Sequence, residues 1–206
     1  MKKILLVTVL TIALACTACS KKAAVKTSAG SGSGNQTPVT QVLEDLSEDL
    51  DSFQLQIDDV IYTMPMKYSD FVSYGFEMNE DDSEKIEPKY YGWASFHLGD
   101  LKIESTVINA DKKTRSISKC YVGGIEIKNK NENGKDAFIA LPKGIIFNKS
   151  TLDDVLAAYG EPSKIYELST YTMYVYEFGI NRSVTINIGK TSGVVDSFEV
   201  RNLLVK

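Results

Sequence analysis

Two short stretches of the chain decide the fold: residues 125–129 read IEIKN, and residues 198–202 read FEVRN. Both run apolar, acidic, apolar, basic, asparagine. Successive side chains of a strand point to opposite faces, so this alternation predicts two strands that each bury one face. Five matching positions in two similar contexts indicate a duplicated unit that ends in such a strand.

A helix is predicted upstream of each of these strands. Residues 71–75 (FVSYG) and 156–160 (LAAYG) both place a tyrosine three residues after a large apolar residue and end in glycine. Glycine after the last apolar residue is typical of a helix end, because it adopts the left-handed conformation at low cost. Ser150 or Thr151 is suited to cap the start of the second helix.

Between each helix and its final strand lie further strand candidates that are rich in aromatic and β-branched residues. They are residues 91–97 and 101–109 in the first half, and residues 164–168, 172–178 and 183–188 in the second. The predicted fold class is therefore α+β, with two tandem modules (51–135 and 136–206). Each module is expected to pack a short helix or helical hairpin on its own antiparallel sheet.

The second half, in which residues 150–162 read STLDDVLAAYGEP, resembles the small envelope modules of the SmpA/OmlA type and the related β-lactamase inhibitor protein-like fold. The resemblance covers residues 141–202 and, more weakly, 57–129. It departs from the family in the segment that leads into the first helix, which matches poorly, and in an acidic insertion. The chain also looks like poorly characterised lipoproteins of Gram-positive anaerobes with YVGGIEI, here at residues 121–127. These resemblances imply a fold and an envelope location, and they carry over no catalytic residues.

The first 18 residues have the pattern of a signal peptide. Lys2 and Lys3 precede an apolar run at residues 4–15. This run is too short for a transmembrane helix, which needs roughly 20 apolar residues. Cys16 and Cys19 follow at its end, and both resemble the lipidated cysteine of bacterial lipoproteins. Cleavage before either one is expected, and an ordinary secretory signal with incidental cysteines is the alternative.

Residues 19–50 are expected to form a flexible tether, because a centre of GSGSG at residues 30–34 cannot bury enough surface to fold. All 27 acidic residues of the chain follow residue 40, whereas five of its 23 basic residues precede it. The folded part is therefore acidic, and a nucleic-acid partner is not expected. The lipid anchor predicts a place on the outer face of the bacterial cytoplasmic membrane, or on the outer membrane in a Gram-negative organism.

Catalytic and metal-binding patterns are not recognisable. His97 is the single histidine of the chain, and no Gly-x-Ser-x-Gly turn accompanies it. Metal ligands at a fixed spacing are not visible, and no cofactor is predicted. Cys120, between Ile117 and Tyr121, is interpreted as a small buried residue rather than as a nucleophile.

The aromatic residues are the remaining functional signal, because tyrosine and tryptophan are enriched in interfaces. The candidate partner surface consists of Tyr91, Trp93, Tyr171, Tyr174 and Tyr176. The alternative is that these side chains fill the core. The predicted function is a non-catalytic binding or scaffold lipoprotein for an envelope protein or a cell-wall partner, and the alternative is an envelope hydrolase acting on peptidoglycan or peptides.

Overall fold

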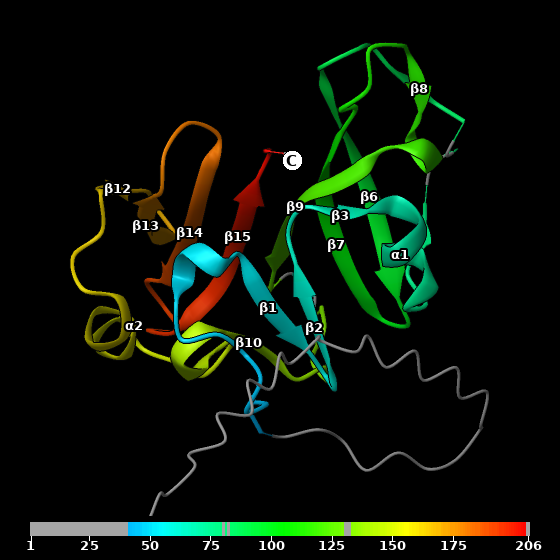
Figure 1. Ribbon diagram of the computed structural model, residues 1–206. Helices are drawn as coiled ribbons and strands as arrows, with labels where there is room; N and C mark the ends of the chain where they lie inside the picture. The colour runs from blue at the N-terminus through cyan, green and yellow to red at the C-terminus, as the bar shows by residue number, and fades with distance from the viewer. Residues whose placement is uncertain (1–40, 80, 82, 130–132, 205–206) are drawn as a thin grey trace, which may run out of the picture. The chain divides into compact units, whose positions relative to one another are not determined.

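The fold consists mostly of antiparallel strands, as the computed structural model in Figure 1 shows. The structure describes residues 41–204, except 80, 82 and 130–132. The predicted signal peptide, both candidate lipidation sites (Cys16 and Cys19) and the part of the predicted tether up to residue 40 lie outside the described residues. Neither described α-helix has the length and apolar character needed to cross a membrane.

A large sheet of nine strands, all paired antiparallel, runs through both halves of the chain. From one edge to the other its strands are β12 (Lys164–Glu167), β13 (Tyr171–Glu177), β14 (Arg182–Gly189), β15 (Val195–Asn202), β9 (Tyr121–Lys128), β7 (Leu101–Ile108), β6 (Tyr91–Leu98) and β4 (Glu77–Met78), and β3 (Met66–Lys67) also pairs with β9. The strand candidates between the helices and the final strands are confirmed to within one residue at each end. The two repeated strands, predicted at residues 125–129 and 198–202, are present but begin four and three residues earlier, at Tyr121 and Val195.

The two copies of the repeated motif lie beside each other at the centre of this sheet. In the antiparallel pairing of β9 with β15, Ile125 is opposite Val200, Glu126 opposite Glu199, and Ile127 opposite Phe198. The duplicated strands therefore join the two halves.

A second sheet has four strands, in the order β11 (Ile145–Ile146), β10 (Ile139–Leu141), β1 (Gln54–Ile57) and β2 (Val60–Thr63). The short strands β5 (Lys85–Ile86) and β8 (Arg115–Ser116) form a separate pair. Short 3-10 helices lie at Leu50–Ser52, Ile117–Lys119 and Pro142–Gly144. The sequence did not predict the small sheet, because its strands are two to four residues long and come from distant parts of the chain.

Both predicted helices are present, as α1 (Tyr68–Ser73) and α2 (Leu152–Tyr159). Thr151 caps α2 in a reciprocal capping box: the backbone N–H of Thr151 donates to Asp154 Oδ2 at 2.8 Å, and Thr151 Oγ1 accepts from the backbone N–H of Asp154 at 3.4 Å. Gly160 ends the helix at φ 73°. The start of α1 has no side-chain cap.

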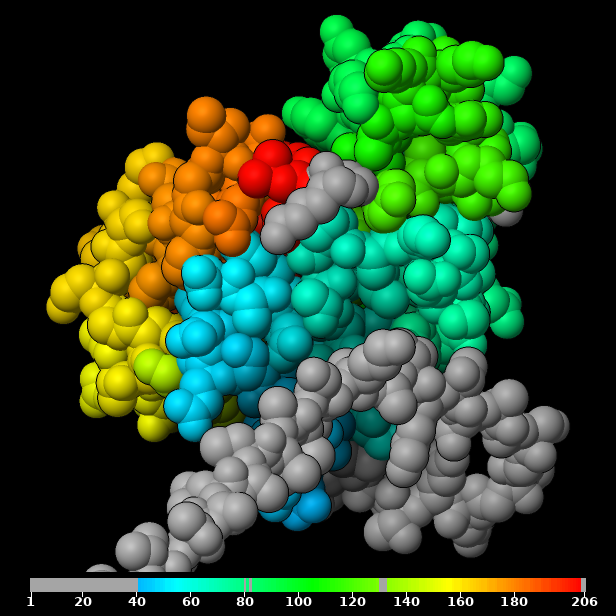
Figure 2. Space-filling model, viewed as in Figure 1, coloured from blue at the N-terminus to red at the C-terminus, as the bar shows by residue number. Residues whose placement is uncertain are grey.

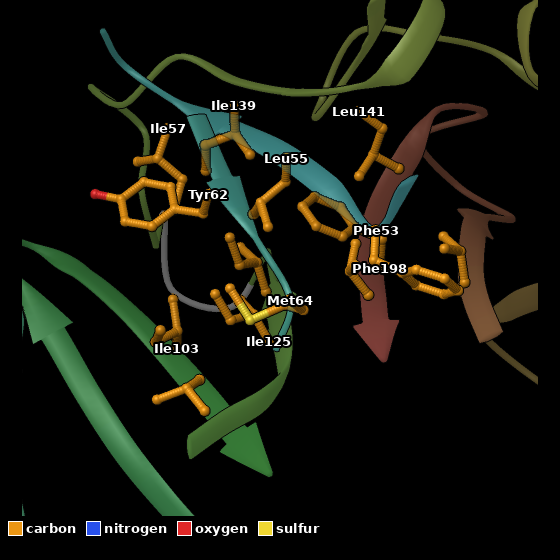
Figure 3. Close-up of a cluster of buried hydrophobic side chains, with 14 of the residues drawn as sticks. Phe53, Leu55, Ile57, Tyr62, Met64, Ile103, Ile125, Ile139, Leu141 and Phe198 are labelled. Carbon is orange, nitrogen blue, oxygen red and sulfur yellow. The ribbon is translucent and has the colours of Figure 1, made fainter. Parts of the chain in front are cut away.

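The core lies between the two sheets. Figure 3 shows side chains of the small sheet, among them Leu55 and Ile139, directed toward Ile125 of β9 and Phe198 of β15. These residues belong to one continuous hydrophobic cluster, which also contains Phe71 of α1 and Val155 of α2. The small sheet and the two helices therefore cover one face of the large sheet.

The predicted α+β class with two helix-on-sheet modules is wrong. Strands make up 47% of the structure and helices 14%. The two halves do not form separate sheets, because the repeated strands pair with each other. The two α-helices, of six and eight residues, share the covered face with the small sheet.

The folded part also starts earlier than residue 51, where the sequence analysis placed the end of the tether. Leu46 and Leu50 are buried. The fully buried Gln56 of β1 accepts a hydrogen bond from the N–H of Leu43 at 2.9 Å and donates one to the carbonyl of Gln41 at 3.0 Å. A buried glutamine thus holds residues 41–43 against the small sheet, because its side-chain oxygen and one of its N–H groups bond to that segment.

Candidate functional site

The large sheet has a second face, turned away from the core, which we call the open face. Strand alternation places Ala94 and Phe96 of β6 in the core and directs Tyr91 and Trp93 to the open face. The same alternation and the strand registers give the side chains of this face from edge to edge. They include Lys164, Tyr166, Tyr171, Met173, Val175, Thr185, Glu199, Arg201, Glu126, Lys128, Glu104, Trp93 and Tyr91.

An exposed aromatic pair stands near one end of the open face. The side chain of Trp93 is 72% exposed and that of Tyr91 47% exposed. Their ring centroids are 5.5 Å apart, and the ring planes are nearly perpendicular at 87°. Such edge-to-face pairs form a rigid apolar surface, which is unfavourable in water and is covered readily by a partner.

The five aromatic residues of the predicted partner surface do not lie together. Tyr171 is half-buried on the open face, whereas Tyr174 and Tyr176 are only 9% and 5% exposed and lie in the core. The hydroxyl of Tyr176 donates to the carbonyl of Gly160 at 3.0 Å, and burial raises its pKa to about 12. Tyr176 thus fixes the end of α2 to the sheet, and neither of the two buried tyrosines is available to a partner.

Tyr166 of β12, which the prediction omitted, is half-exposed on the open face. Tyr166 lies opposite Met173 and therefore shares a face with Tyr171. That inference needs the β12–β13 register, which a single sequence does not provide.

Three glutamates form a row across the centre of the open face. Glu104 of β7 is opposite Glu126 of β9, which is opposite Glu199 of β15. Like charges at directly opposed positions destabilise a sheet unless other groups compensate them. Glu126 pairs with Lys128 Nζ at 2.6 Å, and Glu104 accepts a hydrogen bond from Ser95 Oγ at 2.9 Å.

Glu199 is the least compensated member of this row. Burial raises the pKa of its carboxyl group above the ordinary value, and nearby Glu126 raises it further, although Arg201 and Lys128 oppose the shift. Arg201 Nε is itself buried and has no hydrogen-bond partner among the described residues. The repeated sequence motif contains both glutamates and both basic residues. It predicted two strands, but it did not predict that these strands pair and bring the charged side chains together.

We predict that Glu199→Gln changes how stability depends on pH. In the wild-type protein the raised pKa means that ionised Glu199 lowers the free energy of unfolding as pH rises above 4.5, and that this cost is absent below that value. The variant should therefore melt at a higher temperature than wild type at neutral pH, and the gain should vanish in acid. Melting temperatures between about pH 4 and 8 measure this difference. Glu104→Gln controls for the loss of one charge from the row, and a gain that is independent of pH would contradict the prediction.

His97 and Cys120, the other residues that the sequence analysis considered for chemistry, do not lie at the centre of the open face. His97, near the edge of the sheet, contacts Asn79 Oδ1 at 2.7 Å and Glu77 at 3.4 Å. Cys120 is buried, as predicted, and burial raises the pKa of its thiol. A group of three or more histidine, cysteine, aspartate or glutamate side chains that could hold a metal ion does not occur within the described ranges.

Fold and site together define a mostly β protein with one covered and one open sheet face. Comparisons of the chain with protein-family models, curated proteins and solved structures find no match.

Proposed function

We propose that this chain is a membrane-anchored, extracytoplasmic lipoprotein that binds a protein of the bacterial envelope through its open face and does not catalyse a reaction. The observation that carries the proposal is the exposed pair of Trp93 and Tyr91 beside the row of glutamates on the open face. Tryptophan and tyrosine are the residues that most often dominate the energy of protein interfaces.

The envelope location is supported by the N-terminal sequence. A short apolar run followed by Cys16 and Cys19 is the pattern of a lipidated protein on the outer face of the membrane. Several acyl chains bind a bilayer far more firmly than one, since each buried methylene contributes about 0.8 kcal/mol. A tether of about 20 residues spans on the order of 25 Å, so the folded part works close to the membrane.

The chemistry of the open face favours a protein partner with basic side chains. The row of Glu104, Glu126 and Glu199 complements lysine or arginine, and Trp93 complements an apolar residue beside them. The acidic folded part disfavours nucleic acid.

Site-specific photo-crosslinking in cells tests this function. A photoreactive residue at Tyr91 should give one adduct of discrete mass, and Trp93→Ala in the same chain should abolish it. Ile180, which is 85% exposed in the turn between β13 and β14, is the matched control position and should give no such adduct. Trp93→Ala should leave the melting temperature nearly unchanged, because truncation of an exposed side chain typically costs under about 0.5 kcal/mol. Equal labelling at both positions, or labelling that survives Trp93→Ala, would refute a protein partner on this face.

One observation favours the alternative of an envelope hydrolase. Glu126 and Glu199 are directly opposed, and burial raises the pKa of the Glu199 carboxyl group, as in a carboxyl group that acts as an acid. They lie on a sheet face beside Lys128 and Arg201. If the protein were a hydrolase, the wild type would release soluble fragments from peptidoglycan or peptides. The Glu199→Gln variant would then no longer release them. For the binding function we expect no release by wild type or variant.

A further inference from the structure

A cavity opens where the large sheet divides. Along one edge of β9, residues 124–128 pair with β15, and residues 121 and 122 pair with β3. Because β15 and β3 follow each other along the same edge, the strands separate where one ends and the other begins. The resulting cavity, which we call the seam cavity, has a volume of about 570 Å³, within the range of small-molecule sites. In Figure 2 the red end of β15 lies beside the cyan segment that forms another wall.

The walls of the seam cavity are mainly apolar. They include Phe53, Met64, Pro65 and Leu204. Asn202 Nδ2 donates to the carbonyl of Met64 at 3.0 Å and so ties the end of β15 to the segment before β3. This hydrogen bond joins two walls of the cavity that come from parts of the chain 138 residues apart.

One cation lines this apolar cavity. The guanidinium carbon of Arg182 lies 4.9 Å from the centroid of the Phe53 ring, and Nη1 donates to the carbonyl of Phe178 at 3.2 Å. A guanidinium carries five N–H donors, and this is the one hydrogen bond that the side chain of Arg182 makes within the described part of the chain. The cation–π contact with Phe53 holds the guanidinium at the cavity, and its planar fork favours paired hydrogen bonds to a carboxylate.

Asp51 also lines the cavity, near its exposed rim. Its carboxylate competes with an anionic ligand, so its removal should strengthen binding. Removing the negative charge of Asp51 and removing the positive charge of Arg182 should therefore change the affinity in opposite directions, which an experiment can distinguish.

We propose that the seam cavity binds a carboxylate attached to an apolar body, with Arg182 holding the carboxylate and Pro65, Tyr121 and Leu204 contacting the apolar part. A fatty acid and the carboxyl terminus of a peptide that ends in an apolar residue share this chemistry. The proposal is independent of the partner that the open face binds, because the lining residues Arg182 and Asn202 point to the covered side of the sheet.

Methyl NMR of the protein labelled at its methionines tests the proposal. The probes are hexanoate and N-acetyl-alanyl-leucine, each compared with its uncharged amide. We expect the Met64 methyl resonance to shift and saturate with at least one acid, and the matching amide to bind about tenfold more weakly or worse. A tighter fit to the peptide acid assigns the site to peptide termini, and a tighter fit to hexanoate assigns it to fatty acids.

Variants of the two charged residues complete the test. Arg182→Gln should weaken binding of the acid about tenfold or more, whereas Arg115→Gln, which removes an exposed arginine paired with Asp111, should leave it unchanged. Asp51→Asn should tighten binding, which a folding defect would not do. Equal binding of acid and amide, unchanged affinity in Arg182→Gln, or no shift of Met64 up to about 10 mM of either acid would overturn the proposal.

Discussion

Replacing Cys16 and Cys19 together with serine is expected to move the protein from the membrane fraction into the soluble fraction. The acyl chains are the only anchor that the sequence predicts, since the apolar run at residues 4–15 is too short to span a bilayer. Their loss therefore removes nearly all membrane affinity. Fractionation of cells followed by immunodetection measures this change.

The single variants decide which cysteine is used. The variant that loses the lipidated residue should behave like the double variant, and the other should stay in the membrane. Cys120→Ser is the matched control, because Cys120 lies in the core and should not affect fractionation. A double variant that still sediments with membranes after a high-salt wash would show that lipidation is not the anchor.

Phe198→Ala is expected to cause the largest loss of stability at the join between the two halves. Phe198 is almost fully buried, lies opposite Ile127 in the β9–β15 pairing, and packs edge-on against Phe147 with ring centroids 5.9 Å apart. Truncating a buried phenylalanine costs about 3–5 kcal/mol of unfolding free energy. For a domain of this size, that corresponds to a melting temperature lower by about 6–20 °C.

Thermal unfolding followed by circular dichroism measures this effect, and Trp93→Ala is the control. Both variants truncate an aromatic side chain of the same sheet, one in the core and one on the open face. If the two lose similar stability, the join would not be the structural centre that its packing indicates. A Phe198→Ala transition in two steps would show that the halves can unfold separately.

The local structure was largely predictable from the sequence. Residues 125–129 and 198–202 alternate in the sequence and form strands, and the Tyr-Gly endings at residues 74–75 and 159–160 end helices. Thr151 caps α2 as its residue type and position suggested. Such features are predictable because each depends on neighbours within a few residues, whose spacing matches the period of a strand or helix.

The function-related geometry was not predictable in the same way. Alternation showed that Tyr174 and Tyr176 share a face, but it could not show that this face is the core, because both faces of that strand carry apolar residues. At the seam cavity the fold places Arg182 against Phe53 and Asn202 against Met64. No local sequence pattern predicts these contacts.

The sequence by itself determined a signal peptide pattern with two candidate lipidation sites, an acidic folded part, and the strands and helices of two similar halves. Only the tertiary structure decided that the repeated motifs pair with each other, that Glu126 meets Glu199, and that a small sheet rather than helices fills the centre of the covered face. The physical reason is that pairing and register depend on packing between segments far apart in the chain, and the same alternating strand is compatible with several neighbours until that packing selects one.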